Sequence, residues 1–394
     1  MEKTIGLYIH VPFCRSKCAY CDFYSVTDND DYQRYVDSLI LHMEDYAPGV
    51  RDCTVDTVYI GGGTPSILPK KVMLDLINGI YKNFRVLKEA EFTIEVNPAT
   101  ATQSMFNAYH AIGINRLSIG MQSSCDNELR ALTRIHDFED FEECYKSARR
   151  AKFDNINLDI MYGIPEQTEA SLRMTLEAAC ALSPEHISLY GLKIEENTPF
   201  AYGRDSLSLP DEDTEYNMYA NSVEYLASQG YHQYEISNFS REGYQCRHNL
   251  KYWFCREYLG LGPGAHSYLN GCRFSFKRDL GLYMDAMERY NSEYELTDEK
   301  YDISPKDRIG EYVMLQLRLT RGLDVNKFYE LFGIDFERMY ARYLPVYVEN
   351  GFMEKSENFY RFTLKGMYVS NYILSAMLDF DSEILDNIAR GTDK

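Results

Sequence analysis

Short β-branched runs alternate with longer amphipathic stretches along the first half of this 394-residue chain. The β-branched runs cover residues 6–11, 57–60, 91–96, 116–121, 156–161 and 186–192, and the amphipathic stretches cover residues 31–46, 70–84, 102–112, 138–151 and 169–181. Strands and helices that alternate at this spacing form parallel sheets with right-handed crossovers. Six strands are fewer than the eight of a closed barrel. We therefore expect an α/β fold, an open (βα)6 partial barrel of the TIM type, with its function at the carboxyl ends of the strands.

The second half of the chain has a different organisation. Residues 211–229 predict a helix, residues 231–275 are rich in glycine and aromatic residues without clear periodicity, and the polar residues 291–305 are typical of a linker. Residues 307–318, 325–332, 336–349 and 366–378 predict helices, and residues 352–354 and 360–364 predict a hairpin. This combination indicates a C-terminal, mainly helical, winged-helix-like domain. We expect a core domain at residues 1–235, a connecting segment at 236–300 and the C-terminal domain at 301–394.

The formal net charge of −19 disfavours binding to nucleic acid or to anionic lipids. No run of lysine and arginine offsets it, so we expect a structural or docking role for the winged-helix-like domain instead of DNA binding. The apolar run at residues 5–11 is too short and too polar for a signal peptide, and no stretch is long enough to span a membrane. The ten cysteines are then expected to be reduced thiols in a cytoplasmic protein.

Three cysteines are close together directly after the first predicted strand. Cys14, Cys18 and Cys21 form a C-x3-C-x2-C motif. A four-iron cluster normally takes four thiolates, so three leave one iron open to chelate the amino and carboxylate groups of S-adenosylmethionine (SAM). The alternative is structural zinc, which needs a fourth ligand that is not found nearby. The motif therefore predicts a [4Fe–4S] cluster that binds SAM.

Further motifs resemble one family along most of the chain. They are YIHVPFC at residues 8–14, GGGTPS at 61–66, SIGMQS at 118–123, LTRIH at 132–136, DIMYGIP at 159–165, HISLY at 186–190, YEISNF at 234–239 and GLGPGAHS at 260–267. Together with the cysteine motif, they resemble the radical SAM family of oxygen-independent coproporphyrinogen III dehydrogenases. The resemblance is closer still to the relatives of these enzymes, the heme chaperones of the HemW family.

Several polar residues end or follow the predicted strands, where a barrel binds its ligand. They are Glu95, Gln122, Arg134 and Asp159. From the residues alone, each could equally be a helix cap or a surface residue. The resemblance implies that these four contact SAM, and it implies the same for Tyr8, Tyr20, Gly62, Gly63 and Thr64. The dehydrogenases bind a second SAM, and several of these positions belong to that second site.

Two features favour the chaperones over the dehydrogenases. The dehydrogenases carry a further cysteine two residues after the third, where this chain has Phe23. A plain core residue is the alternative interpretation of Phe23. In addition, only seven residues precede Tyr8, whereas the dehydrogenases have a longer N-terminal arm that helps to hold the porphyrinogen.

A third feature is the sequence H-N-x-x-Y-W, which matches the heme-associated motif of the chaperones. It places His248, Asn249, Tyr252 and Trp253 in one segment, directly after Arg247. A neutral imidazole can ligate iron, aromatic rings can lie against a porphyrin, and an arginine can pair with a propionate. The alternative for His248 is a hydrogen-bonded loop residue. His266 and His10 are two further candidates for a heme ligand.

The resemblance thus implies a heme chaperone that binds heme and delivers it to a heme-accepting, respiratory or other, protein. The cluster and SAM would support heme transfer or the formation of a homodimer. The alternative function is an enzyme that decarboxylates two propionates of coproporphyrinogen III through a 5′-deoxyadenosyl radical. We assign no catalytic residue from the sequence.

Overall fold

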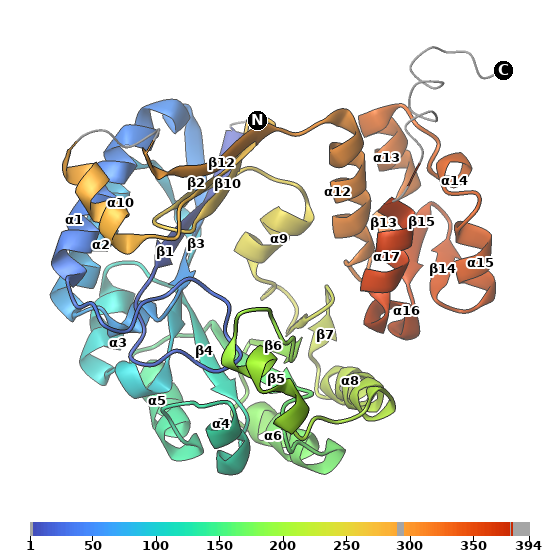
Figure 1. The fold of residues 1–394 in the computed structure, drawn as a ribbon, viewed down its shortest axis with the longest axis horizontal. Coiled ribbons are helices and arrows are strands. Elements are labelled where there is room, and N and C mark those ends of the chain that lie inside the picture. Colours follow the sequence, from blue (N-terminus) through green and yellow to red (C-terminus); the bar gives the residue numbers. More distant parts are fainter. Residues whose placement is uncertain (1–2, 290–294, 379, 381–394) are drawn as a thin grey trace.

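The computed structural model describes residues 3–289, 295–378 and 380 (Figure 1). Its largest element is a 12-stranded sheet in the order β12-β11-β10-β9-β1-β2-β3-β4-β5-β6-β8-β7. The strands β1 to β6 are neighbours in chain order, and each is parallel to the next. They span Lys3–Val11, Cys53–Gly62, Val86–Val96, Arg116–Gln122, Ile156–Tyr162 and His186–Gly191. All six predicted strands are therefore confirmed, and with them the partial (βα)6 barrel.

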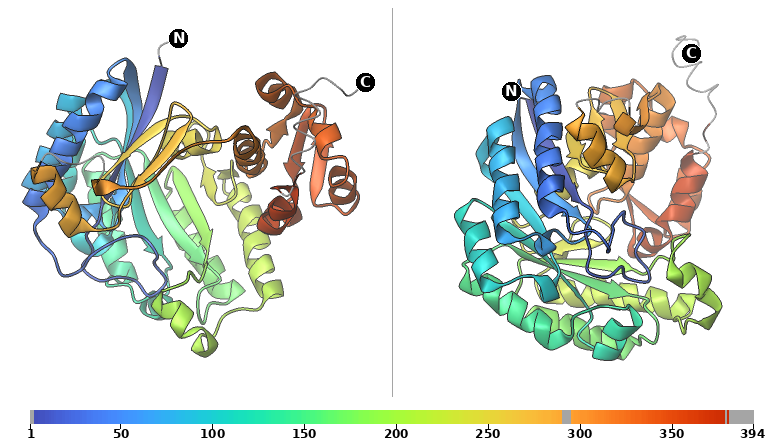
Figure 2. Two further views of the ribbon diagram at one scale, coloured as in Figure 1. Left: turned by 45° about the horizontal axis from the view of Figure 1, so that its top comes forward. Right: turned by 60° about the vertical axis from the view of Figure 1, so that its left-hand side comes forward.

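The helices that connect these strands cover the outer face of the sheet (Figure 2). They are α1 (Tyr32–Tyr46), α2 (Lys70–Asn83), α3 (Gln103–Ala111), α4 (Asp126–Ala131), α5 (Phe138–Arg150) and α6 (Glu169–Ala181). After β6, α7 (Pro199–Tyr202) and α8 (Glu212–Ser228) follow.

Successive side chains of a strand point to opposite faces of the sheet. In β1, Ile5, Leu7 and Ile9 belong to the apolar core, while Tyr8 and His10 alternate with them. The inner face of the barrel is therefore polar.

The region after α8 contains regular structure that the sequence pattern does not predict. It forms β7 (His232–Gln233), β8 (Asn238–Ser240), α9 (Arg247–Trp253), β9 (Tyr258–Leu261), β10 (His266–Leu269), β11 (Cys272–Phe276), α10 (Leu280–Glu288) and β12 (Thr297–Asp302). β9 pairs in parallel with β1, and β12 pairs with β11. The expected linker is therefore wrong at residues 297–302, which form β12, and the segment without clear periodicity contains strands and helices too short to show one. Residues 291–294 of the expected linker lie outside the described residues. We propose that the barrel domain extends to residue 302 instead of 235.

The C-terminal part is mainly helical, as expected, with a three-stranded sheet in the order β13-β15-β14. Its elements are α12 (Pro305–Leu317), β13 (Leu323–Asp324), α13 (Val325–Phe332), α14 (Phe336–Met339), α15 (Leu344–Glu349), β14 (Met353–Ser356), β15 (Phe359–Phe362), α16 (Leu364–Tyr368) and α17 (Ser370–Leu378). The single helix predicted at 336–349 is wrong. Pro345 is in the first turn of α15, where a proline is tolerated, whereas it would break a continuous helix. The helix predicted at 366–378 is likewise divided into α16 and α17. Across the described residues, no helix has the length and apolar character needed to cross a membrane.

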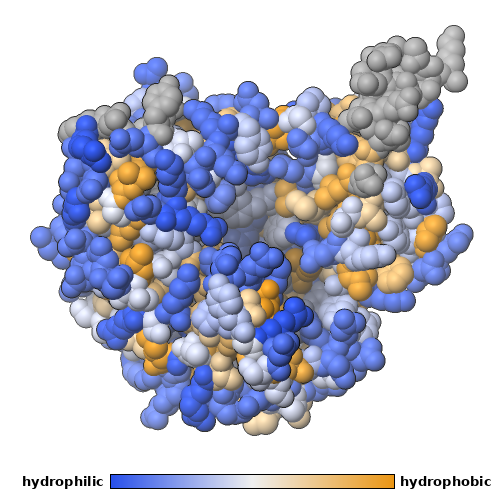
Figure 3. All heavy atoms as spheres, in the orientation of Figure 1, coloured by the Kyte–Doolittle hydropathy of each residue, from blue (hydrophilic) through white to orange (hydrophobic). Residues whose placement is uncertain are grey.

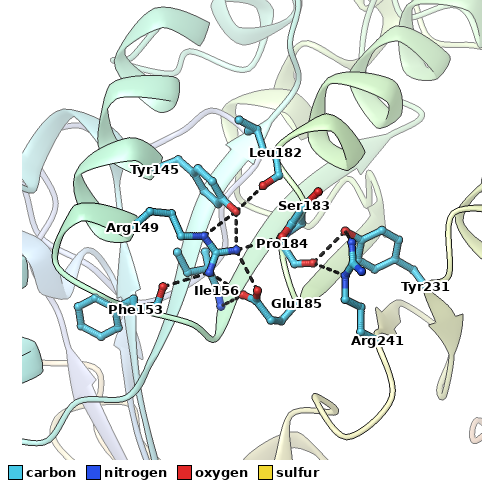
Figure 4. Close-up of polar contacts among 10 residues, drawn as sticks. All are labelled: Tyr145, Arg149, Phe153, Ile156, Leu182, Ser183, Pro184, Glu185, Tyr231 and Arg241. Atoms are coloured by element: carbon cyan, nitrogen blue, oxygen red, sulfur yellow. Dashed lines mark hydrogen bonds and ion pairs between the residues drawn. The ribbon is translucent and has the colours of Figure 1, made fainter.

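A polar network fixes the amino ends of β5 and β6 (Figure 4). The guanidinium of Arg149, at the end of α5, donates to the hydroxyl of Tyr145 and pairs with the carboxylate of Glu185 at 2.9 Å. The same carboxylate accepts a 2.9 Å hydrogen bond from the backbone N–H of Ile156, the first residue of β5. The side chain of Glu185 thereby links the end of α5 to the starts of β5 and β6, which holds this side of the barrel together.

The barrel and the C-terminal domain meet at the loop that contains Glu235. The backbone of Glu235 pairs with that of Leu319, and the N–H of Thr320 donates to the carbonyl oxygen of Tyr234 at 3.1 Å. The side chain of Glu235 is fully buried, and its carboxyl lies close to the side chain of Asn238 and the backbone of Ser237. Burial raises the pKa of Glu235 from its ordinary value of 4.5 to about 7.

We therefore expect Glu235→Gln to flatten the pH dependence of stability. A carboxyl whose pKa is higher in the folded state stabilises the fold fully below pH 4.5, and this contribution is lost as the pH rises through 7. The free energy of unfolding of the wild type should fall between pH 5 and pH 8, with Glu235 contributing on the order of 3 kcal/mol. Urea denaturation at the two pH values measures the fall. Glu242→Gln, at an exposed position, is the control; an equal fall in Glu235→Gln and wild type would contradict the expectation.

Candidate functional site

The three motif cysteines lie on the loop between β1 and α1, at the carboxyl end of the first strand. The N–H of Cys14 donates to the carbonyl oxygen of Val26 at 2.9 Å, and the N–H of Cys21 donates to that of Cys18 at 3.1 Å. These bonds fold the loop back on itself. All three cysteines are free and only partly buried. Their thiols are therefore open to a ligand.

Two polar side chains from outside the loop contact these cysteines, Thr64 after β2 and Arg134 between α4 and α5. The hydroxyl of Thr64, after β2, lies 3.4 Å from the sulfur of Cys14, and the guanidinium of Arg134 donates to the sulfur of Cys18 at 3.5 Å. The Nε of Arg134 is enclosed and has no hydrogen-bond partner among the described residues. The loop is also anchored by the N–H of Ala19, which donates to the hydroxyl of Thr133 at 2.9 Å.

This environment fits an anionic iron–sulfur cluster. Burial raises the pKa of the Cys21 thiol, and binding to iron would replace that proton. Arg134 supplies a positive charge beside the sulfur of Cys18. Within the part of the chain that the structure describes, no three His, Cys, Asp or Glu side chains converge closely enough to hold a metal ion. The thiols would have to turn toward one another around a cluster, and the ligand set stays a prediction.

The glycines after β2 form a close contact with the cysteine loop. Gly62 has a φ of 108°, which favours glycine, and its N–H donates to the carboxylate of Glu95 at 3.1 Å. A Cβ on Gly63 would lie 2.6 Å from the carbonyl oxygen of Phe13, the residue before Cys14. The N–H of Gly63 donates to Val11 at 2.8 Å. Only glycine fits at this approach of two backbones, so the glycine run is more than a plain turn.

Two carboxyl groups lie inside the barrel below this end. The carboxylate of Glu95 accepts a 2.9 Å hydrogen bond from the hydroxyl of Tyr59. Burial, and secondarily the charge of Asp159, raises the pKa of Glu95 to about 7. Asp159 accepts hydrogen bonds from Ser118 at 3.0 Å and from Asn157 at 2.8 Å, and burial raises its pKa as well. Near neutral pH, Glu95 can therefore either donate or accept a proton in a hydrogen bond to a ligand.

The other residues predicted to contact SAM lie around the same end of the barrel. Gln122, the last residue of β4, and Arg134 both lie over Gly120, where an added Cβ would be 2.9 Å from the Gln122 amide nitrogen and 3.1 Å from the Arg134 guanidinium. The Tyr8 ring lies beside that of Tyr59, with 6.3 Å between centroids. Tyr20 is on the cysteine loop, and burial raises its pKa. Figure 3 shows a hollow with a mostly polar margin near the centre of the molecule. The structure thus brings the residues that are predicted to contact SAM to the end of the barrel at which the cysteine loop lies.

The H-N-x-x-Y-W segment lies elsewhere. It forms α9, and the side chain of His248 is buried against the earlier parts of β1 and β2, away from the cysteine loop. One ring nitrogen of His248 lies 2.9 Å from the hydroxyl of Thr57 and the other lies 2.8 Å from that of Tyr252. Its backbone N–H donates to the carboxylate of Glu91 at 2.9 Å. Burial lowers the pKa of His248 to about 3.

This arrangement bears on the two interpretations of His248, as a heme ligand or as a hydrogen-bonded residue, and the heme contacts of the segment stay a prediction. Both ring nitrogens of His248 are already hydrogen-bonded, so the alternative of a hydrogen-bonded structural histidine describes it better. Trp253 donates no described hydrogen bond from its ring but accepts one at its carbonyl oxygen, from Gln316 at 2.6 Å. The segment therefore connects the barrel interior to α12. Asn249, the remaining residue of the motif, is partly buried.

The two other candidate histidines differ in accessibility. His10 is buried, with its ring nitrogens 3.1 Å from the hydroxyl of Tyr8 and 2.9 Å from the carbonyl oxygen of Tyr24, and burial lowers its pKa to about 4. His266, the first residue of β10, is exposed. Phe23 is 67% exposed, so its interpretation as a plain core residue is wrong.

Sequence reasoning missed two residues of this site. Tyr59 bonds Glu95, and Thr133 anchors the cysteine loop. Thr57, Tyr59 and Gly61 are two residues apart and therefore lie on the same face of β2. This period of two could have identified Tyr59 as a residue that faces the site. Thr133 lies on a loop, and no local pattern predicts its contact with a residue more than a hundred positions earlier.

Comparisons with known proteins show which family and fold this chain resembles. The Radical SAM superfamily model matches residues 8–179, and the HemN C-terminal domain model matches residues 303–369. The chain is 33% identical to a protein of Bacillus subtilis named heme chaperone HemW, covering 94% of this chain and 98% of that protein. Its counterpart of the same name from Escherichia coli is 32% identical, with coverages of 95% and 98%. The structure of coproporphyrinogen III oxidase (HemN) from Escherichia coli superimposes with a TM-score of 0.83 at 23% identity, covering 96% of this chain and 91% of that one. This last similarity shows the fold alone.

Proposed function

The chain belongs to the HemW family of radical SAM proteins, and from this premise we propose that it binds heme and hands it to a heme-dependent protein. The observation that carries the proposal is the similarity to HemW proteins along 98% of their length. Phe23 supports it as well, because this residue stands where the dehydrogenases carry a further cysteine. A respiratory enzyme is the recipient that we favour. Ten free thiols favour a reducing compartment, the cytoplasm.

We further propose that Cys14, Cys18 and Cys21 hold a [4Fe–4S] cluster. When bound, such a cluster supplies electrons one at a time and an open iron for SAM. Thr64 and Arg134 would orient two of the thiolates. Glu95 and the backbone of Gly62 and Gly63 would receive the amino and carboxylate ends of SAM, with Tyr8, Tyr20, Gln122 and Asp159 around them. The resemblance supports these roles, and the contacts among the residues are compatible with them. We also propose that the protein forms a homodimer when the cluster is bound.

An anaerobic titration with hemin tests the proposed function. Protein with a reconstituted cluster should bind hemin saturably, about one per chain, as followed by Soret absorbance. A titration that stays linear, without saturation at any ratio, would exclude specific heme binding and with it the chaperone.

The retained Glu95, Gln122, Arg134 and Asp159 also support a second candidate function, oxygen-independent coproporphyrinogen III dehydrogenase. Incubation with coproporphyrinogen III, SAM and a reductant under anaerobic conditions tests it. We expect no protoporphyrinogen IX, because Phe23 replaces the further cysteine of the dehydrogenases. Product formed with repeated turnover would favour the enzyme over the chaperone.

A further inference from the structure

The strand β4 ends in a strained turn at Gln122, one of the residues predicted to contact SAM. The pairing of β4 with β5 shifts register between Gly120 and Gln122, which marks a bulge. Gln122 has a φ of 62°, in the left-handed region, and the N–H of Ser123 donates to the carbonyl oxygen of Met121 at 2.8 Å. Residues other than glycine rarely adopt such a three-residue turn, and it persists only where its surroundings hold it.

Two helices hold the chain after this turn. The hydroxyl of Ser123 donates to the carboxylate of Glu128, in α4, at 2.5 Å. The N–H of Ser124 donates to the hydroxyl of Thr175, in α6, at 3.1 Å. Both contacts lie beyond the centre of the turn, so they do not by themselves fix the carbonyl group of Met121.

A five-residue segment after α4 joins the cysteine loop to the end of β4. It consists of residues 132–136, and we name it the 132–136 loop. Through Thr133 and Arg134 it contacts the cysteine loop. The guanidinium of Arg134 also reaches Gly120, where it would lie 3.1 Å from an added Cβ, beside the side-chain amide of Gln122. One short loop thus contacts both the cysteine loop and the end of β4.

The last residue of this loop, His136, is buried although it is polar. It is only 3% exposed, whereas the apolar Ile135 beside it is 41% exposed, the reverse of the usual preference. The ring of His136 lies close to the backbone of Met121. Burial, and secondarily the charge of Arg134, lowers the pKa of His136 to about 3. The ring is therefore neutral near pH 7 and carries one N–H that it can donate.

We propose that His136 is a positioning residue for SAM, which supports the backbone of Met121 and thereby holds the turn that presents Gln122 to the ligand. This proposal rests on the proposed SAM site and adds one residue to it. The ring N–H of His136 would donate to the carbonyl oxygen of Met121, which also accepts from the N–H of Ser123. A carbonyl oxygen has two lone pairs and can accept both hydrogen bonds.

A neutral imidazole suits this position better than a charged donor. A lysine or an arginine in place of His136 would bring a second positive charge beside Arg134, at a position that solvent does not reach. The imidazole donates a hydrogen bond without adding a charge. Because Thr133 and Arg134 of the same loop contact the cysteine loop, the loop that holds Gln122 also touches the residues predicted to bind the cluster. The 132–136 loop would thus place SAM and the cluster relative to each other.

Anaerobic calorimetric titration of the full chain, with a reconstituted cluster, by SAM tests the proposal. His136→Ala should weaken SAM binding about tenfold, the effect of one lost hydrogen bond, while bound iron and visible absorbance keep their wild-type values. His136→Asn and His136→Gln each place an amide N–H near one of the two ring nitrogens. At least one of them should restore the affinity to within about threefold of the wild type. His232→Ala, which removes an exposed histidine on β7, is the matched control and should bind SAM like the wild type.

A double-mutant cycle with Gln122→Ala separates positioning from a general loss of structure. Gln122→Ala alone should weaken SAM binding at least as much as His136→Ala does. In the Gln122→Ala background, His136→Ala should add less than about twofold, because His136 acts through Gln122. Effects of the two changes that multiply independently would overturn the proposal, and so would wild-type SAM affinity in folded His136→Ala.

The remaining outcomes separate this proposal from the SAM site and from the heme function. Failure of both amide variants to restore binding would overturn the role of His136 as a donor. Wild-type protein with a full cluster that binds no SAM would overturn the SAM site itself, whereas the hemin titration tests the chaperone separately. Urea denaturation verifies that each variant is folded. If His136→Ala does not fold, His136→Phe, which keeps a ring without an N–H in the buried space, replaces it and should bind SAM as weakly.

Discussion

Replacement of Cys14, Cys18 or Cys21 by alanine is expected to remove the iron–sulfur cluster entirely. A [4Fe–4S] cluster on three thiolates already lacks one protein ligand, so the loss of a second leaves two irons without a protein ligand. After anaerobic reconstitution, visible absorbance near 400 nm and bound iron should fall to about a tenth of the wild-type value or less, an order-of-magnitude expectation from the ligand count. The three cysteines lie on a partly exposed loop outside the apolar core, so the variants should remain folded.

Cys255→Ala and Cys246→Ala are the matched controls for this experiment. Neither cysteine is near the loop: Cys255 follows α9, and Cys246 contacts Glu91 in the barrel interior. Both variants should keep the full cluster absorbance. Loss of the cluster in either one, with the protein folded, would refute the three-ligand assignment.

Gly63→Ala is expected to have the second largest effect, on both stability and cluster content. The new methyl group would lie 2.6 Å from the carbonyl oxygen and 2.9 Å from the nitrogen of Phe13, and 2.9 Å from the carbonyl oxygen of Val11. These are backbone atoms that cannot rotate away, and the carbonyl oxygens of Val11 and Phe13 accept hydrogen bonds from the N–H groups of Gly63 and Thr64. The end of β1 must shift, and Cys14 with it. We expect the free energy of unfolding to fall by about 3 kcal/mol and the cluster content to fall severalfold.

Urea denaturation and iron analysis of the same preparation measure the two effects. Gly49→Ala is the control, since no atom lies within 4 Å of its added Cβ and its φ is not in the left-handed region. It should change the free energy of unfolding by less than about 1 kcal/mol. If Gly63→Ala has the stability and the cluster content of the wild type, then the contact between the glycine run and the cysteine loop does not position Cys14.

The sequence allowed the barrel to be predicted because its strands are long and apolar on one face. Each of β1 to β6 has at least six residues, enough for the period of two and the flanking helices to be recognised. β9 has only four residues and pairs with β1, some 250 positions earlier, through tertiary contacts that no local pattern encodes. The division of the helix at 336–349 could have been predicted, since Pro345 was visible in the sequence.

The candidate site was predictable in its position and not in its details. Residues that end parallel strands must meet at one edge of the sheet, so Glu95 and Gln122 were expected near the cysteine loop. The environment of His248 depends on Thr57 and Tyr252, and therefore on how α9 packs into the barrel. A motif shows which residues recur in a family, whereas burial decides whether a nitrogen is available. The exposed His266 could be told from the buried histidines only in the folded structure.

The measurement that tests the account most directly is heme transfer from the loaded protein to an acceptor. Wild-type protein carrying one hemin per chain is mixed with heme-depleted membranes that contain apo-cytochromes, and the Soret spectrum of each partner is followed in time. If this chain is a chaperone, transfer occurs through a complex, and its rate should rise with the concentration of the acceptor. A transfer rate that is independent of acceptor concentration and equal to the rate of spontaneous heme dissociation would contradict a delivery function.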